Sequence, residues 1–430
     1  MEMMHEDSAE SYSRIHPFMV LFASQNPNAV VALDRDSENC FYRCFMSSPV
    51  ASYACGEHAK CKKLLGADGT HFRHQHYNGI LLSLHTIDGD DHTLLVAVAI
   101  VPVESEEHWH WFFSLCCKSG VVFGNKVLFV DRDKGSIAAS SAMAVNGIKM
   151  NMRWCTQHII GNCIDKFGIS TNDVQFRAYV IALQRAMDVD QHHARMQAIA
   201  SEYGEGVAEY LCCINPTSWM QYANCNAFTE QIQNWQRLSS MDVVNDNDAI
   251  CNMLHSSVQD ESITNLFLGT PMCMYGVKDT NFVEGQNAIF MKSGFRDCLP
   301  YKSIRCYQDY MVQQTFERNE KAKTWIEENC VLTPYAQQFY DNEKLKTGQC
   351  DANQVSITDD LETVTVWDTY RLSTQYSVNI KEVKCQCTLF DQIGIVCRHL
   401  LFAMKLCNKT FNVYEYFDTC YLVESYADAF

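Results

Sequence analysis

The sequence has no run of apolar residues that approaches the roughly 18 needed for a membrane-spanning helix. Its first residues, MEMMHEDSAESYSR, also lack the basic start and the apolar core of a secretory signal. We therefore expect an intracellular protein that is not anchored in a membrane. Internal repeats and low-complexity tracts are missing as well, so no repeat architecture is expected.

Positive charge is scarce too. The chain has 34 lysines and arginines against 51 aspartates and glutamates, which gives a net charge of −17. Affinity for DNA depends on neutralising phosphates with lysine and arginine. The balance therefore argues against a protein whose whole surface binds nucleic acid. DNA binding would require a local basic surface or a separate basic module.

Disulfides are not expected, although the chain has 22 cysteines. A reducing compartment favours free thiols or metal ligands. One irregularly spaced group near the N-terminus is predicted to be packed thiols rather than a metal site. Its members are Cys40, Cys44, Cys55, His58 and Cys61.

What the chain does have is enough hydrophobic sequence for a large core. With 430 residues, 47% of them hydrophobic and 20% charged, it is predicted to fold into two or three units. Patterning and the Asn78-Gly79 hairpin signal predict strands at 64–67, 80–87, 94–101, 127–130 and 152–154, with helices at 109–116 and 137–145. Three antiparallel strands, a helix, a strand, a helix and a strand is the order of a ribonuclease-H-like core. The predicted class is α/β.

Two aspartates follow apolar strands directly. Asp68 ends the first of the predicted strands, and Asp131 ends the strand at 127–130. Carboxylates from different strands can converge and offer the hard oxygen ligands that Mg²⁺ prefers. Such a site would suit phosphodiester chemistry with two divalent ions about 4 Å apart. A turn or cap role for each aspartate stays open, and Asp133 is the alternative to Asp131.

Four soft ligands form two tight pairs near the C-terminus. Cys385 and Cys387 are followed, after nine residues, by Cys397 and His399. Two thiols at a strand end, with a thiol and an imidazole at a helix start, can bind one tetrahedral Zn²⁺. The spacing therefore predicts a zinc site inside a small β/α module. Arg398, Lys405 and Lys409 would make this module locally basic.

Cys155 and His158 share one face of a predicted helix start. They could be half of a zinc site, but no second pair of ligands lies nearby in the sequence. We favour a role beside the carboxylate site, with His158 donating to a substrate phosphate, over plain packing.

Four segments of the chain form a set when they are taken together. They are Asp68-Gly69-Thr70 with Tyr77-Asn78-Gly79 and Glu104 to Trp111; Val130 to Gly135; Cys155 to His158; and Thr280 to Asn287. In this order they resemble conserved elements of Mutator-like (MULE-type) transposases. The C-x-C…C-x-H module resembles the SWIM-type zinc finger that commonly follows the catalytic domain in this family.

The resemblance implies a DDE-type transposase, which cuts the ends of a mobile element and joins them to target DNA. It implies Mg²⁺ or Mn²⁺ at a triad of Asp68, Asp131 and Glu284, and Zn²⁺ at the SWIM-type site. The implied active-site support consists of Cys155, His158, Asn281 and Asn287. Double-stranded DNA, self-association on DNA and a nuclear location are expected, with neither a membrane nor a small-molecule substrate.

The predicted organisation of the chain follows from these assignments. It consists of a lead-in at 1–62, the first part of the ribonuclease-H-like core at 63–160, a helical insertion at 161–270, the last catalytic helix and following helices at 271–340, a polar linker at 341–360, the zinc finger at 361–410 and a tail at 411–430.

Basic residues follow Glu284 closely and are predicted to place positive charge beside the metal site for DNA binding. They are Lys292, Arg296, Lys302 and Arg305.

Two other functions stay open. One is a domesticated transposase relative that binds DNA and regulates transcription without catalysis. The acidic balance and the missing N-terminal zinc-binding DNA domain, which many relatives carry, favour it or a truncated element copy. The other is a zinc-stabilised interaction protein that carries the acidic triad by accident.

Overall fold

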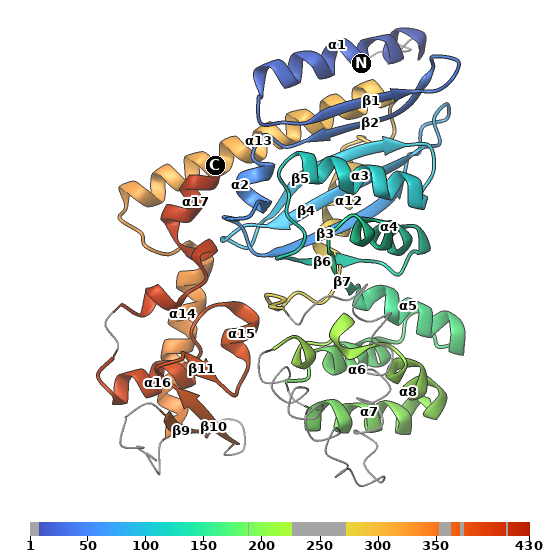
Figure 1. Ribbon diagram of the computed structural model, residues 1–430. Helices are drawn as coiled ribbons and strands as arrows, with labels where there is room; N and C mark the ends of the chain where they lie inside the picture. Colours follow the sequence, from blue (N-terminus) through green and yellow to red (C-terminus); the bar gives the residue numbers. More distant parts are fainter. Residues whose placement is uncertain (1–7, 188, 226–271, 352–362, 370–373, 410–411) are drawn as a thin grey trace. The chain divides into compact units, whose positions relative to one another are not determined.

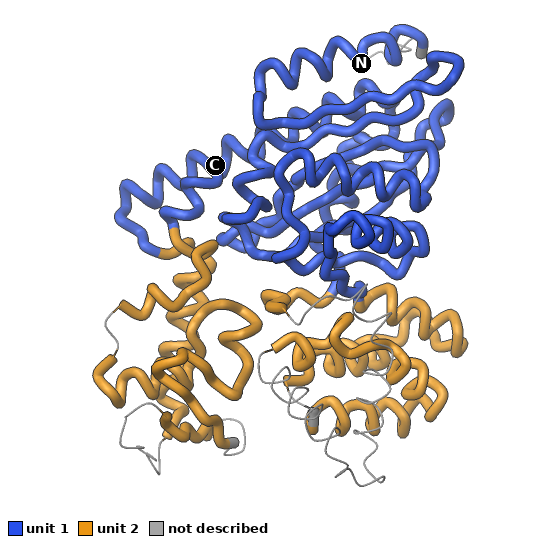
Figure 2. Tube along the Cα trace, viewed as in Figure 1, with its two compact units in different colours: residues 1–155, 279–331, 423–430 blue, residues 156–278, 332–422 orange. Residues whose placement is uncertain are grey.

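Figure 1 shows a computed structural model of the chain, and Figure 2 shows its division into two compact units. The first unit comprises residues 1–155, 279–331 and 423–430, and the second comprises 156–278 and 332–422. The structure describes residues 8–187, 189–225, 272–351, 363–369, 374–409 and 412–430. Residues 226–270 of the expected insertion and 352–360 of the expected linker lie outside the described residues.

A seven-stranded mixed sheet organises the first unit, in the order β1-β2-β5-β4-β3-β6-β7. The strands are β1 (Val31–Arg35), β2 (Phe41–Ser47), β3 (Leu64–His71), β4 (Ile80–Ile87), β5 (Thr93–Val101), β6 (Val127–Val130) and β7 (Asn151–Trp154). β4 is antiparallel to β3 and β5, whereas β6 runs parallel to β3 and β7. The α/β class and the predicted element order are confirmed.

The predicted lead-in, residues 1–62, contributes two strands to this sheet. β2 pairs with β5, and β1 pairs with β2 at the edge of the sheet. Of the irregular group near the N-terminus, Cys44, Cys55 and Cys61 are buried, as predicted for packed thiols. Cys40 and His58 are exposed.

Helices cover both faces of the sheet. They are α1 (Ser8–Gln25), α2 (Ala51–Cys55), α3 (Glu106–Lys118), α4 (Lys134–Val145), α12 (Asn281–Lys292), α13 (Pro300–Glu327) and α17 (Val423–Ala429). On one face, Trp109 of α3 and Met143 of α4 pack with Leu82. On the other face, α1, α12 and α13 pack against the neighbouring residue, Leu81. Burial on both faces explains why β4 and β5 read as nearly continuous apolar runs.

A buried ion pair fastens α13 to the sheet. Arg318 Nε donates to Asp88 Oδ2 at 2.7 Å, and the Asp88 side chain has no exposed surface. The backbone N–H of Leu95 donates to Gln314 Oε1 at 3.0 Å. These bonds compensate the cost of burying polar groups between helix and sheet.

The second unit contains the helices that follow β7 and the zinc module. Its elements are α5 (Thr156–Phe167), α6 (Val174–Gln184), α7 (Val189–Tyr203), α8 (Glu205–Cys212), α14 (Pro334–Lys346), α15 (Leu389–Ile393), α16 (Arg398–Leu406), and the strands β8 (Cys350–Asp351), β9 (Thr363–Asp368), β10 (Thr374–Asn379) and β11 (Lys384–Cys385). The short 3-10 helices are η1 (Pro216–Ser218), η2 (Tyr222–Asn224), η3 (Thr347–Gln349), η4 (Val413–Tyr416) and η5 (Thr419–Tyr421). The strands form a small antiparallel sheet, in the order β11-β10-β9-β8.

The first part of the expected linker is helical. Residues 341–346 complete α14, and β8 then pairs with β9. The physical reason is Glu343, which is 3% exposed and accepts from Arg398 Nε at 3.1 Å. A polar composition suggested a linker, but this glutamate is polar because it has a buried partner.

Candidate active site and metal centre

Asp68 lies in β3, on the face that α12 covers. Gly66, two residues earlier on that face, leaves no room for a side chain, because its Cβ would lie 2.3 Å from Phe282 and 2.6 Å from Val283. α12 therefore packs directly on β3, and Asn287 Nδ2 donates to Asp68 Oδ2 at 2.8 Å. The structure thus brings together two of the residues predicted for one site.

Asp131 follows β6, the parallel neighbour of β3. Their register pairs Gly66 with Phe129, so Asp68 and Asp131 each lie two residues further along adjacent strands. Asp133 is the N-cap of α4, where its carboxylate accepts from the N–H groups of Gly135 and Ser136 at 2.7 and 3.0 Å. This capping role accounts for Asp133 without a metal.

Glu284 lies in the first turn of α12, where hydrogen bonds connect its side chain to Thr280 and, through Thr280, to Cys155. The Thr280 hydroxyl donates to Glu284 Oε1 at 2.7 Å and lies 3.1 Å from Cys155 Sγ. A hydroxyl has one proton, so the Cys155 thiol donates to Thr280 when Thr280 donates to Glu284. Cys155 is therefore tied to Glu284 through Thr280.

Asn281 and His158, the other two residues predicted to support the active site, differ in exposure and in the element that carries them. Asn281 is exposed and its amide donates to Asp279 Oδ2 at 2.9 Å, so it stabilises the start of α12. His158 is partly buried in the first turn of α5, in the second unit. The carboxylates of Asp68, Asp131 and Glu284 do not all lie within 4.8 Å of one another, and the described residues hold no such group made of carboxylates alone.

Glu104 is a fourth acidic residue, which belongs to one of the motifs in the sequence but was not predicted as a site residue. It precedes α3, and Trp109 Nε1 donates to its Oε1 at 3.0 Å. Burial, followed by the nearby charges of Asp133, Asp131 and Asp68, raises the pKa of Glu104 to about 7. The signal in the sequence was the spacing of this glutamate, five residues before a core tryptophan.

The basic residues after Glu284 do not share one environment. Lys292, Lys302 and Arg305 are exposed. Arg296 is 6% exposed, and burial lowers its pKa. The Arg296 side chain is therefore buried, unlike those of the other three, because packing removes it from the surface position that the local spacing suggested.

The zinc ligands predicted from the sequence lie together in the second unit. Cys385, Cys387, Cys397 and His399 are all buried, and their ligand atoms lie within 4.8 Å of one another. β11 ends at the first thiol, and Cys397 is the N-cap of α16. Two thiols at a strand end and a Cys/His pair at a helix start match the donor set of a closed tetrahedral zinc site.

The surroundings of this cluster orient its histidine. His399 Nδ1 lies 3.7 Å from Cys385 Sγ, whereas His399 Nε2 lies 3.3 Å from Asp368 Oδ2. Tyr376 stacks on the imidazole with ring centroids 4.3 Å apart. Nδ1 therefore faces the ligand cluster, and the carboxylate holds the opposite nitrogen, as in many zinc sites. Arg398, expected to add positive charge to the surface, is instead bound to buried Glu343.

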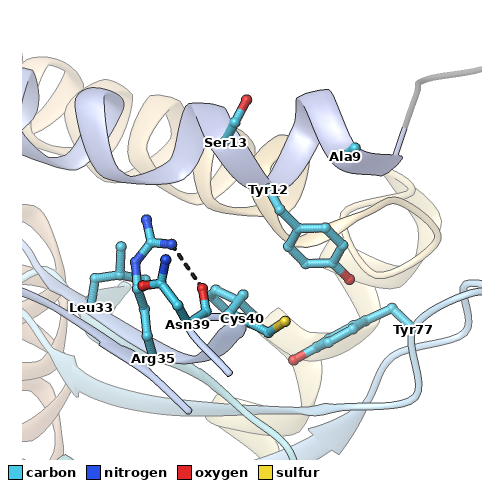
Figure 3. A pocket seen from close by; sticks show the side chains of 9 residues that line it. Ala9, Tyr12, Ser13, Leu33, Arg35, Asn39, Cys40 and Tyr77 are labelled. Atoms are coloured by element: carbon cyan, nitrogen blue, oxygen red, sulfur yellow. Dashed lines mark hydrogen bonds between the residues drawn. The ribbon is translucent and has the colours of Figure 1, made fainter. Parts of the chain in front are cut away.

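A separate cavity of about 430 Å³ lies in the first unit, between α1 and the β1–β2 hairpin (Figure 3). Its lining includes three aromatic residues, Tyr12, Phe41 and Tyr77, and the basic residue Arg35. Tyr77 belongs to the hairpin between β3 and β4, where its ring packs edge-on against Phe72. This aromatic group supports the hairpin that follows Asp68.

Comparisons with known families find two domains in this chain. The MULE transposase domain matches residues 64–162, which include Asp68 and Asp131. The SWIM zinc finger matches residues 362–408, which include all four predicted zinc ligands. A search of curated proteins gave no match. No helix among the described residues is long and apolar enough to cross a membrane. The chain therefore carries a MULE transposase domain and, near its C-terminus, a SWIM zinc finger.

Proposed function

We propose that this protein is a DDE-type DNA transposase with a ribonuclease-H-like core. The observation that carries the proposal is the placement of Asp68 and Asp131, each two residues past the last paired residues of the adjacent parallel strands β3 and β6, with α12 bound to Asp68 through Asn287. α12 also carries Glu284, the third acidic residue of the triad. The match of the MULE transposase domain over both aspartates supports the same function.

The donor set suits Mg²⁺ or Mn²⁺, because hard carboxylate oxygens are the preferred ligands of these ions. Next to Asp68, Asn287 adds a buried amide oxygen that finds no hydrogen-bond partner in the described part of the chain. Bound divalent ions would activate the attacking oxygen and stabilise the leaving oxygen of a phosphodiester. The triad of Asp68, Asp131 and Glu284 would hold the ions, while Thr280 and Asn287 fix the orientation of the carboxylates.

DNA is the substrate in this proposal. Exposed Lys292, Lys302 and Arg305 supply local positive charge on the elements that carry or follow Glu284, which an acidic chain needs for phosphate binding. His158 would donate to a phosphate. With this function we also propose that the protein self-associates on DNA and is located in the nucleus.

The experiment is a cleavage and strand-transfer assay with the zinc-loaded chain and DNA that ends in the element's own terminal repeats. We expect Mg²⁺-dependent cleavage that EDTA abolishes. Binding of the terminal repeats without cleavage, with Mg²⁺ or Mn²⁺ present, would contradict the enzyme.

The second candidate function is a DNA-binding regulator derived from a transposase, or a truncated copy. The observations that favour it are the net charge of −17 and the burial of Arg296 and Arg398, which leave fewer free cations than the sequence suggested. A regulator would give binding without cleavage in the same assay.

A further inference from the structure

We propose that Glu104 is a further carboxylate ligand of the divalent cation site between the middle of β3 and the end of β6, together with Asp68 and Asp131. The inference rests on the proposed function, and it adds to the triad a residue from the other face of the sheet.

The position of Glu104 is set by Gly69, the residue after Asp68. A Cβ at Gly69 would lie 2.9 Å from Cδ and from both carboxylate oxygens of Glu104. Glu104 therefore lies against β3 one residue from Asp68, on the opposite face because successive residues of a strand alternate. The strand pairing of β3 with β6 ends at Gly66 and Phe129, so beyond it side chains from both faces can meet around the end of β6.

The two carboxylate oxygens of Glu104 differ in their hydrogen bonds. Trp109, which is 1% exposed, donates to Oε1 at 3.0 Å. Within the described parts of the chain, Oε2 has no hydrogen-bond partner. The tryptophan thus orients the carboxylate and leaves an oxygen for a ligand.

A structural role alone does not explain a glutamate here. Glutamine would accept the same bond from Trp109 without carrying charge. The charge instead faces Asp131, Asp133 and Asp68 in a half-buried position, and each of these aspartates destabilises the ionised form. A divalent cation reverses this balance, because it attracts every carboxylate in the group.

A second observation points to a ligand at the same place. Asn287 is 6% exposed, its Nδ2 is bound to Asp68, and its Oδ1 has no hydrogen-bond partner among the residues that the structure describes. A buried amide oxygen without a donor costs about 1–3 kcal/mol. A cation held by Asp68, or the water bound to that cation, would supply the missing partner.

The test is Mn²⁺ binding to the full, zinc-loaded chain, measured by electron paramagnetic resonance of free Mn²⁺ at pH 8. We expect Glu104→Gln to weaken Mn²⁺ binding at least tenfold. The matched control is Glu106→Gln, two residues on, where the side chain is exposed at the start of α3; it should bind Mn²⁺ like the parent. Glu104→Asp keeps the charge and should bind Mn²⁺ more tightly than Glu104→Gln. Parental affinity in Glu104→Gln, or equal affinity in the two Glu104 variants, would overturn the inference.

Two more variants separate this inference from the proposed function. If Asp68→Asn and Asp131→Asn abolish Mn²⁺ binding and DNA cleavage but Glu104→Gln changes neither, Glu104 is no ligand and the transposase proposal stands. If Mn²⁺ binding depends on Glu104 but the parent cuts no DNA, the cation site stands and the transposase proposal fails. A parent that binds no Mn²⁺ at millimolar concentration overturns both.

Discussion

The two metal sites proposed for this protein differ in how far they are assembled. In the zinc site, Cys385, Cys387, Cys397 and His399 are buried with their ligand atoms within 4.8 Å of one another. In the acidic site, Asp68, Asp131 and Glu284 occupy a strand, a strand end and a helix, and are not gathered to that extent. The ligand atoms of the zinc site are already close enough to bind one ion, whereas the carboxylates of the acidic site are not.

The chemistry of the ligands explains this difference. Thiols and imidazoles can be neutral, so they pack together in a hydrophobic interior without strong repulsion. Hydrogen bonds to Cys385 and Cys397 lower the pKa of the Cys387 thiol, whereas the bond to Cys387 raises the pKa of Cys385 and burial raises the pKa of Cys397. The cluster therefore favours one thiolate, at Cys387, beside two neutral thiols. Carboxylates ionise at neutral pH and repel one another, and at Glu104 burial first and then the nearby aspartates raise the pKa. A zinc module can thus be complete before its ion arrives, whereas an acidic site closes around its cations.

Removing zinc should give the largest effect and should confine it to the zinc module. Structural zinc contributes about 10–16 kcal/mol in small zinc fingers. We therefore expect chelation, or Cys397→Ser, to remove hydrogen-exchange protection from residues 374–409 while β3 to β6 stay protected. Cys407→Ser, on the cysteine that caps the end of α16, is the control and should keep its zinc. An equal loss of hydrogen-exchange protection in the large sheet would show that zinc stabilises both regions and would contradict this prediction.

The large sheet should depend instead on its buried ion pair. Arg318→Ala leaves the buried carboxylate of Asp88 without its ion-pair partner, and breaking a buried pair in this way costs about 3–5 kcal/mol. We expect a matching loss in the free energy of unfolding of the first unit, measured by urea titration, with zinc content unchanged. Arg305→Ala, on an exposed residue of the same helix, should change stability by no more than about 0.5 kcal/mol. A loss of zinc in Arg318→Ala would show that the two regions are not independent.

A smaller effect is expected from the carboxylate that orients His399. Asp368→Asn keeps the shape of the side chain but removes its charge, and changes of this kind lower zinc affinity about 10- to 100-fold. Competition with a chromophoric chelator measures the change. Glu382→Gln, on an exposed residue between β10 and β11, is the matched control. Parental affinity in Asp368→Asn would mean that Nε2 needs no partner.

The smallest effect concerns DNA held by the exposed cations. The double variant Lys302→Glu/Arg305→Glu should weaken DNA binding whatever the sequence, and should reduce the slope of log affinity against log salt by about 2. Arg296→Ala should lower stability and leave this slope unchanged, because Arg296 is buried. If the slope falls only in Arg296→Ala, the exposed basic residues are not the binding surface.

Local patterns were sufficient to predict much of this molecule. The strands from β3 to β7 are short apolar runs between turn signals, and the zinc ligands are two pairs close in sequence. Ser105, directly before α3, caps that helix, and its hydroxyl accepts from the N–H of His108. Such features depend on a few neighbouring residues, which is why one sequence was enough.

Features that depend on distant partners were missed. Glu343 looked like part of a polar linker because its partner, Arg398, lies 55 residues away. Arg296 looked exposed because nothing nearby shows that its segment packs against the sheet. Glu104 was read only as a motif residue, since its proximity to Asp68 and Asp131 arises from the sheet. The contact of Asn287 with Asp68 spans 219 residues, and the resemblance to a known family brought it into the site.

The most direct test of the account is DNA cleavage by the parent and by Asp68→Asn, measured with zinc-loaded protein in Mg²⁺. Asparagine can still accept the bond from Asn287, so the fold and DNA binding should persist. The account predicts cleavage by the parent and a loss of about 1,000-fold or more in Asp68→Asn, as expected when several kcal/mol of charge stabilisation is removed. Equal cleavage by both proteins, or none by the parent, would contradict it.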